Sequence, residues 1–517
     1  MGGAVARRGD LRIYHVATLC YSVKAMKCLL SVLLYLLCCL GWWPYKVVCA
    51  ETTQNAALDA NQQAVADSIG CRACHATVQL DPPHQLACTR CHGGNGTETT
   101  QEKAHLGLIA RPGHPQQMVA TCGQCHPQVV ALALHASHFT LANKINSVRQ
   151  HFGARDPLSG VQEIPAEERP SSLLSLADDM LRRRCLRCHV YASGDQYSGV
   201  TRGVGCAACH LSWKEGKMQS HQFRAPQDRQ CLSCHYGNYV GWDYYGRYEH
   251  DYNWEYRTPY TEQTPQRYPA RPYGIEYHQL VPDIHQQRGL VCIDCHGQSG
   301  HESKEVQLSC RTCHGWQPGQ LLQNKRLQVH DTQLLLTAAD GRQHPVPLLR
   351  HPAHQQYGNT VACQVCHGQW SFNDSSTHVL RTEKVDYEQW ERLMVQGSSE
   401  IETLLQHNAY STDELPLIMR DGITAEPRPG IWLQGFGQRR WEQMIIERDV
   451  DGVIKVFRPI LDLHLSMVDR QGKVIFDDQS GQGRTRLPYV PHTTGPAGLF
   501  YQQRFQHLLA PTSESKP

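Results

Sequence analysis

One five-residue motif, Cys-X-X-Cys-His, occurs nine times between residues 71 and 367 of this 517-residue chain. It uses 18 of the 23 cysteines, and the other five lie within the first fifty residues. Whatever the motif binds must therefore shape most of the fold. The nine copies are Cys71, Cys74 and His75; Cys88, Cys91 and His92; Cys122, Cys125 and His126; Cys185, Cys188 and His189; Cys206, Cys209 and His210; Cys231, Cys234 and His235; Cys292, Cys295 and His296; Cys310, Cys313 and His314; and Cys363, Cys366 and His367.

Two thiols separated by two residues lie on one side of a helical turn, where they form thioethers with the two vinyl groups of a porphyrin. The histidine that follows directly reaches the iron as its proximal ligand. Structural zinc is the competing interpretation, but it needs two such pairs per metal and no histidine after every second cysteine. All nine copies carry that histidine. The sequence therefore predicts nine haem c groups, with the nine motif histidines as proximal iron ligands.

The sixth ligand of most irons is expected to be a second histidine, because the chain contains 30 histidines and only nine methionines. Ligation by two histidines lowers the reduction potential relative to methionine and histidine. For each candidate the alternative is a position at the surface or beside another iron ligand, and the sequence does not pair a candidate with a particular iron. The distal candidates are His84, His105, His114, His138, His221, His285, His301, His354, His378 and His492.

Residues 1–50 are predicted to be a signal peptide, with Met26 as an alternative start. Lys27 precedes an apolar run over 29–43, and small residues at 48–50 suit cleavage. Twin-arginine export through Arg7-Arg8, lipidation at Cys49 and an uncleaved membrane anchor are the alternatives. No other apolar run approaches the roughly 20 residues of a membrane span. We expect an exported protein of the periplasm or cell surface.

The net charge of +2 and the lack of a basic cluster interleaved with aromatics argue against a nucleic-acid partner. Porphyrins are large apolar bodies, so the protein needs less side-chain core and tolerates long loops. The expected fold is mostly α with extensive irregular loops packed around haems. A small β-meander is expected in the haem-free C-terminal region.

Three regions are expected after the signal peptide. Residues 51–160 hold haems 1–3, residues 161–385 hold haems 4–9, and residues 386–517 hold a helix and the β-meander. The segment from Asp156 to Pro170 is the linker candidate, because it carries three prolines. The insert 236–291 is rich in tyrosine and forms either aromatic cladding over haems or a substrate pocket.

Local patterns predict helices over 128–138, from Ser171 onward, and over 386–406. Hairpins are expected around Asp451-Gly452 and around Gly472, where alternating apolar residues flank a turn.

The motifs, their tight spacing, and the segments 202–210 and 283–296 resemble the multihaem c-type cytochromes of bacterial respiratory and extracellular electron transfer. The resemblance covers about residues 65–370. It implies an electron carrier whose redox partners are other cytochromes or a membrane quinol-oxidising complex, with outer-membrane association or self-association left open. The alternative is an enzyme with one open haem for a small nitrogen or sulfur compound, as in hydroxylamine oxidoreductases and octahaem tetrathionate reductases.

Overall fold

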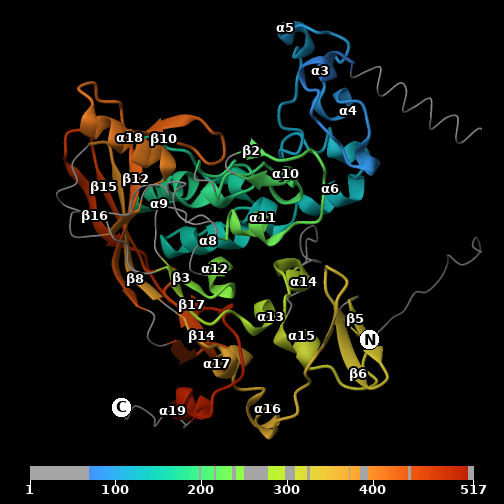
Figure 1. The fold of residues 1–517 in the computed structure, drawn as a ribbon. Coiled ribbons are helices and arrows are strands. Elements are labelled where there is room, and N and C mark those ends of the chain that lie inside the picture. The colour runs from blue at the N-terminus through green and yellow to red at the C-terminus, as the bar shows by residue number, and fades with distance from the viewer. Residues whose placement is uncertain are drawn as a thin grey trace, which may run out of the picture. The chain divides into compact units, whose positions relative to one another are not determined.

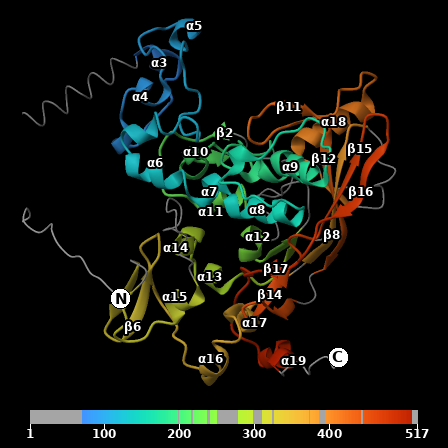
Figure 2. The ribbon, with the colours of Figure 1, turned by 180° about the vertical axis from the view of Figure 1, so that it is seen from behind.

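The computed structural model (Figures 1 and 2) describes most of the chain from residue 69 onward, and all of these residues lie in the compact unit 68–517. The predicted signal peptide lies outside the described residues. The described ranges are 69–196, 199–214, 217–235, 240–249, 277–296, 309–322, 326–371, 373–384, 394–396, 398–440 and 444–509.

The motif-bearing region consists of short helices joined by long loops. Among its described helices, only α8 and α9 reach ten residues. The helices are α3 (Ile69–Cys74), α4 (Thr89–His92), α5 (Gln101–Ala104), α6 (Pro127–Ala133), α7 (Ser137–Thr140), α8 (Ala142–His151), α9 (Leu173–Arg183), α10 (Cys206–His210), α11 (Asp228–Leu232), α12 (Gly241–Tyr244), α13 (Ile284–Gln287), α14 (Cys292–His296), α15 (Cys310–His314), α16 (Pro352–Tyr357) and α17 (Cys363–His367).

The single helix expected over 128–138 is wrong. α6 ends at Ala133, and α7 begins at Ser137 after Ala136 takes an extended conformation. His135 and His138 therefore do not share one helix face. The serine cap predicted for α9 is one residue later than Ser171, because the Ser172 side chain accepts the Ser175 N–H.

The described residues also form six small sheets, so this part of the chain is mixed α and β. The largest has the order β16-β15-β8-β12-β9, in which β15 runs parallel to β8. Its strands are β8 (Asn373–Thr382), β9 (Met394–Gln396), β12 (Ile431–Arg440), β15 (Leu463–Val468) and β16 (Val474–Ser480). A second sheet, β13-β14-β17, contains β13 (Ile445–Arg448), β14 (Ile454–Arg458) and β17 (Leu487–Pro488).

The remaining sheets are short antiparallel pairs or triplets in the loops. They comprise β1 (Trp213–Lys214) with β2 (Lys217–Met218), β3 (Arg247–Glu249) with β4 (Tyr277–Gln279), β5 (Leu327–His330) with β6 (Gln333–Thr337) and β7 (Gln343–Pro345), and β10 (Ile418–Arg420) with β11 (Pro427–Pro429).

Both expected C-terminal hairpins are present, but they do not form one meander. The hairpin at Asp451-Gly452 joins β13 to β14, whereas the hairpin at Gly472 joins β15 to β16 in the larger sheet. The helix expected over 386–406 is also misplaced. Met394–Gln396 is strand β9, and the helix α18 covers Ser399–Tyr410, capped by the Ser398 side chain. Residues 385–393 lie outside the described residues.

The main apolar core lies between the larger sheet and helices α8 and α9 (Figure 1). Leu176 and Met180 of α9 pack with Trp432 of β12 and Leu465 of β15, and all four are nearly inaccessible to solvent. The expected linker 156–170 is packed rather than loose, since Val161 and Ile164 join Leu181 in an adjoining core. No helix in the described part of the chain is long and apolar enough to cross a membrane.

A buried polar network attaches α9 to the sheet. The Asp179 carboxylate accepts hydrogen bonds from the Arg183 guanidinium at 2.6 Å and from the Trp432 indole at 2.9 Å. Arg381 of β8 lies 3.3 Å from the same oxygen. Burial lowers the pKa of Arg183, but the adjacent Asp179 carboxylate opposes this shift. The two side chains form a buried ion pair in which each charge is balanced by the other.

Candidate functional site: nine motifs and their histidine partners

Eight of the nine motifs wind into a compact turn that carries the histidine with it. In the first, second, third and sixth copies, the histidine N–H donates to the carbonyl of the first motif cysteine at 2.8–2.9 Å. In the fifth and in the last three copies, α10, α14, α15 and α17 run from the first cysteine through the histidine. Both thiols and the imidazole thus project from one turn, as thioether attachment requires.

Seven motif histidines each face a second histidine from elsewhere in the chain. The distances between ring centroids lie between 5.9 and 6.5 Å. The pairs are His75 with His105 (6.4 Å), His126 with His84 (6.1 Å), His92 with His221 (6.3 Å), His235 with His138 (6.5 Å), His314 with His285 (5.9 Å), His296 with His492 (6.3 Å) and His367 with His354 (6.2 Å).

This spacing suits a metal between the rings. Two imidazoles bonded to opposite sides of one metal at about 2 Å per bond have ring centroids about 6 Å apart. Rings in direct face-to-face contact are closer, as with His189 and Tyr191 at 4.7 Å. Every second member of the seven pairs is one of the distal candidates predicted from the sequence.

Backbone carbonyls orient several of the motif histidines. The Nδ1 atoms of His92, His314 and His367 lie 3.0, 2.7 and 3.0 Å from the carbonyl oxygens of Ile109, Pro347 and Gly495. A carbonyl only accepts, so Nδ1 carries the proton and Nε2 keeps its lone pair. This tautomer is the one that binds a metal through Nε2. The Nδ1 atom of His210 makes the same contact with Arg224, at 2.9 Å.

Carboxylates play the same role for two of the partner histidines. Asp81 lies 2.7 Å from His84 Nδ1, and Asp283 lies 2.8 Å from His285 Nδ1. Asp283 also accepts the Thr494 N–H at 2.6 Å and the Thr494 hydroxyl at 2.7 Å. Burial raises the pKa of Asp283, but these hydrogen bonds together bring it below its usual range. An aspartate shortly before a histidine is a signal that the sequence analysis missed.

The segment 492–495 connects three motif sites. His492 faces His296, Thr494 binds Asp283 beside His285, and the Gly495 carbonyl orients His367. The C-terminal region, which has no motif of its own, thus supplies groups to the seventh, eighth and ninth sites.

Burial keeps many of these imidazoles neutral. It lowers the pKa of His235 to about 4, with smaller contributions from neighbouring histidines that include His138. Burial also lowers the pKa of His221, His314 and His492. A neutral imidazole is the state that binds a metal, so no proton has to be displaced near pH 7.

The motif thiols line accessible space rather than a closed core. All 18 are partly or fully exposed, although free cysteine is among the most often buried residues. Large apolar side chains near the first three motifs are also exposed, Leu106 to 79% and Val119 to 57%. Accessible thiols beside uncovered apolar surface, between opposed imidazoles, fit a large apolar group that carries a metal.

Cysteine thiols of different motifs interact and so order the motifs in space. Hydrogen bonds join Cys71 to Cys88, Cys122 to Cys206, Cys231 to Cys292, and Cys310 to Cys363. The bond from Cys206 lowers the pKa of Cys122 to about 6, and the bond from Cys310 does the same for Cys363.

Other thiols also lie close to one another and so connect these four pairs. Burial, and then the neighbouring thiol, raises the pKa of Cys91 near Cys122, of Cys209 near Cys234, and of Cys295 near Cys313. The resulting order of motifs is one, two, three, five, six, seven, eight and nine. The fourth motif stands beside the sixth, through Cys188 and Cys234.

The fourth motif does not share the geometry of the others. The His189 N–H donates to Leu186 rather than to Cys185, and the His189 backbone is extended (φ −79°, ψ 153°). Its Nε2 lies 3.0 Å from the Phe139 carbonyl, and its Nδ1 accepts the Tyr191 N–H at 3.3 Å. The nitrogen needed for a metal bond therefore carries a proton, so His189 in this arrangement does not fit an iron ligand.

Tyr191 lies between His189 and the distal candidate His114. Its ring stacks on His189 at 4.7 Å and meets His114 edge-on at 5.2 Å. Of the other distal candidates, His378 lies in the larger sheet with His464, and His301 lies outside the described residues.

The described parts of the tyrosine-rich insert are bonded into the protein. Tyr244 donates its hydroxyl proton to the Leu290 carbonyl at 2.6 Å, and Tyr245 donates to Asp228. Burial raises the pKa of both phenols, with added contributions from nearby motif cysteines and carboxylates. These two tyrosines lie next to the sixth and seventh motifs. Residues 250–276 of the insert lie outside the described residues.

Comparison of the chain with protein-family models, with curated proteins and with solved structures gives no match.

Proposed function

We propose that the chain is an exported electron-transfer protein that holds nine c-type haems, most of them between two histidines. The observation that carries this proposal is the set of seven histidine pairs at 5.9–6.5 Å, each with one member in a Cys-X-X-Cys-His motif. A bound haem supplies an iron that exchanges single electrons between its ferrous and ferric states.

The residues of the chain set the conditions for that exchange. The motif cysteines would attach the porphyrin and the paired histidines would bind its iron, and ligation by two histidines favours a low potential. The carbonyls and the carboxylates of Asp81 and Asp283 fix the imidazole orientations, which keeps the ligand set unchanged between oxidation states. The contacts between neighbouring motifs support a continuous series of cofactors, as transfer between redox proteins at its ends requires.

The pairing is tested with His354→Ala, made in a host that matures c-type cytochromes. We expect the purified protein to keep nine haems by intact mass. Electron paramagnetic resonance of the oxidised variant should show one added high-spin iron, because His367 has lost its partner. The matched control is His330→Ala, which removes an exposed histidine of β5 and should leave the spectrum unchanged. An unchanged spectrum in His354→Ala contradicts the pairing, and a colourless folded wild-type protein contradicts the haem proposal.

A second candidate function is supported by the fourth motif. Because His189 is bonded to Phe139 and stacked on Tyr191, a haem on Cys185 and Cys188 would lack His189 as a ligand and would be open to a small substrate. The protein is then an oxidoreductase in which the other sites relay electrons, and Tyr191 and His114 lie beside the substrate.

Carbon monoxide separates the two functions, because it binds ferrous haem only where a coordination position is free. The enzyme predicts a carbon monoxide difference spectrum that is lost when Cys185 and Cys188 are both changed to serine. The control changes Cys310 and Cys313 to serine, which also removes one haem but should preserve the spectrum. A wild-type protein inert to carbon monoxide leaves only the carrier.

A further inference from the structure

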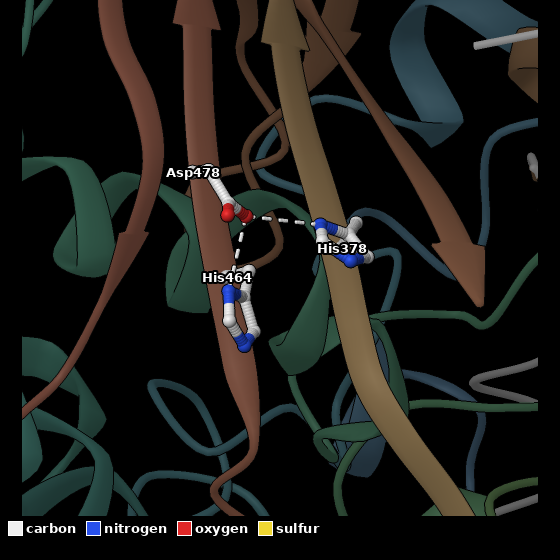
Figure 3. A group of neighbouring side chains, drawn as sticks. All are labelled: His378, His464 and Asp478. Atoms are coloured by element: carbon white, nitrogen blue, oxygen red, sulfur yellow. Dashed lines mark hydrogen bonds and ion pairs between the residues drawn. The ribbon is translucent and has the colours of Figure 1, made fainter. Parts of the chain in front are cut away.

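Two histidines and an aspartate that belong to none of the cysteine motifs meet on the larger sheet (Figure 3). His378 lies on β8, His464 on β15 and Asp478 on β16. Their ligand atoms all fall within 4.8 Å of one another. The Asp478 Oδ1 atom lies 3.2 Å from His378 Nδ1 and 3.0 Å from His464 Nδ1.

The strand register explains why the two imidazoles meet. His464 stands directly opposite His378 in the parallel β15–β8 pair, so both side chains leave the same face of the sheet. Their ring centroids are 4.9 Å apart. Neither ring belongs to the core, because the two side chains are 25% and 22% exposed.

A distortion of β16 brings the carboxylate to the histidines. The register between β15 and β16 shifts between Leu465 and Met467, where β16 carries one extra residue. Asp478 lies in this bulge with a backbone φ of +48°, a conformation that residues other than glycine seldom adopt. Bulges redirect side chains, and strained backbone of this kind gathers at functional sites.

Two further residues, Asp462 and His151, are connected to the cluster of His378, His464 and Asp478. Asp462 lies 3.6 Å from His464 Nε2, on the side of the ring away from Asp478, and is itself held by the Ser376 N–H at 2.6 Å. His151 is only 4% exposed, its Nε2 has no hydrogen-bond partner among the described residues, and Asp462 acts on it electrostatically.

We propose that His378, His464 and Asp478 form a binding site for one divalent transition-metal ion of the Zn²⁺, Ni²⁺ and Cu²⁺ class. Two imidazole nitrogens and one carboxylate oxygen are the donors this class prefers over Mg²⁺ or Ca²⁺. Both histidines offer Nδ1 toward the carboxylate, and Asp462 stands where it orients His464 through Nε2. Asp478 is 58% exposed, so the ion enters from solvent and leaves positions for water.

The inference does not depend on haem. The three residues belong to strands of a sheet that carries no cysteine motif, and the ion would join β8, β15 and β16 across the sheet surface. A metal ion bound at this site can therefore be quantified separately from any haem iron.

The test uses the full-length protein as purified, stripped with a chelator and titrated with Zn²⁺ by calorimetry, with zinc and iron counted by plasma mass spectrometry. We expect one zinc site that is lost in His378→Gln and in Asp478→Asn. Asp462→Asn should weaken binding about 10- to 100-fold, as loss of an orienting carboxylate does. The matched control is His330→Gln, an exposed histidine beside Asp331 that should leave binding unchanged.

Cu²⁺ provides a second readout, since its electron paramagnetic resonance spectrum shows hyperfine structure from two nitrogen ligands in the wild type and from one in His378→Gln. If the two ligand variants bind Zn²⁺ with the stoichiometry and affinity of the wild type, the proposal is overturned. Iron content distinguishes this result from failure of the haem proposal. A normal iron count with no zinc difference rejects only the metal site, and a zinc difference without iron rejects only the haems.

Discussion

Asp283 is the residue on which two of the histidine pairs most directly depend. Its carboxylate accepts four hydrogen bonds, from the backbone N–H and the ring of His285 and from the N–H and hydroxyl of Thr494. It thereby fixes His285 and anchors the segment that carries His492.

We expect Asp283→Asn to lower the free energy of unfolding by about 2–3 kcal/mol at pH 7, because it removes hydrogen bonds to a buried charge. The pKa of Asp283 is lower in the folded protein than in the unfolded chain. The stabilisation is therefore present above the unfolded value of about 4 and is lost as the pH falls through the folded value. Urea unfolding of variant and wild type at pH 7 and pH 3 checks this prediction.

Asp331→Asn is the control, because Asp331 is 88% exposed and pairs only with an exposed histidine in the described contacts. A difference at pH 3 as large as that at pH 7 would show that the carboxylate charge is not the cause.

At the scale of residues, the sequence predicted in part which histidines the folded chain brings to the motif histidines. Seven of the ten distal candidates face a motif histidine. Which histidine meets which motif was not predictable, since the members of a pair come from as far apart as His296 and His492. His378 was assigned to the haem region, although its partners His464 and Asp478 are brought to it only by strand pairing.

At the scale of elements, α9 depends on its buried attachment to the sheet. Asp179 accepts hydrogen bonds from Arg183 of its own helix and from Trp432 of β12, and Arg381 of β8 lies against it. The same helix leads directly into Cys185 of the fourth motif.

We expect Asp179→Asn to destabilise the protein by about 3–5 kcal/mol, because it leaves the buried Arg183 guanidinium without its counter-charge, whereas Arg381 keeps its ion pair with Glu383. Thermal unfolding followed by circular dichroism measures the effect. Asp413→Asn, at an 81% exposed position, is the control and should change little. A similar melting temperature for wild type and Asp179→Asn would show that the network does not attach the helix.

Helices, strands and turns were predictable where the residues that determine them are neighbours in the sequence. Asp451-Gly452 and Gly472 mark real turns, and the glycines take positive φ there. The assignment of the two hairpins to different sheets was not predictable, because β15 pairs with β8 from a distant part of the chain. The prediction of a single helix over 128–138 was wrong for a different reason. The apolar periodicity continues through the break at Ala136, and no glycine or proline marks that break in the sequence.

At the scale of the whole molecule, apolar core is distributed unevenly. The sheet and helices α8 and α9 share a large buried cluster, whereas exposed apolar side chains such as Leu106 and Val119 lie near the first three motifs. The proposed haems would provide the missing interior in that region.

Protein made without cytochrome maturation should therefore be cleaved first within residues 69–135, while the sheet with α8 and α9 resists. Limited proteolysis with mass spectrometry of the fragments measures this, and haem-loaded protein is the control. Equal resistance of the two regions in the haem-free protein would contradict a structural role for haem.

The position of residues 492–495 near the end of the sequence affects the order in which the motif sites can be completed as the chain folds. A polypeptide that crosses a membrane from its N-terminus delivers these residues among the last, yet they supply His492 and the groups that hold His285 and His367. If the chain is exported in this way, His296 of the seventh motif would meet His492 only after translocation is nearly finished, and His285 and His367 would gain the groups that orient them at the same late stage. A product truncated before residue 492 would carry all nine motifs and still lack the histidine that faces His296.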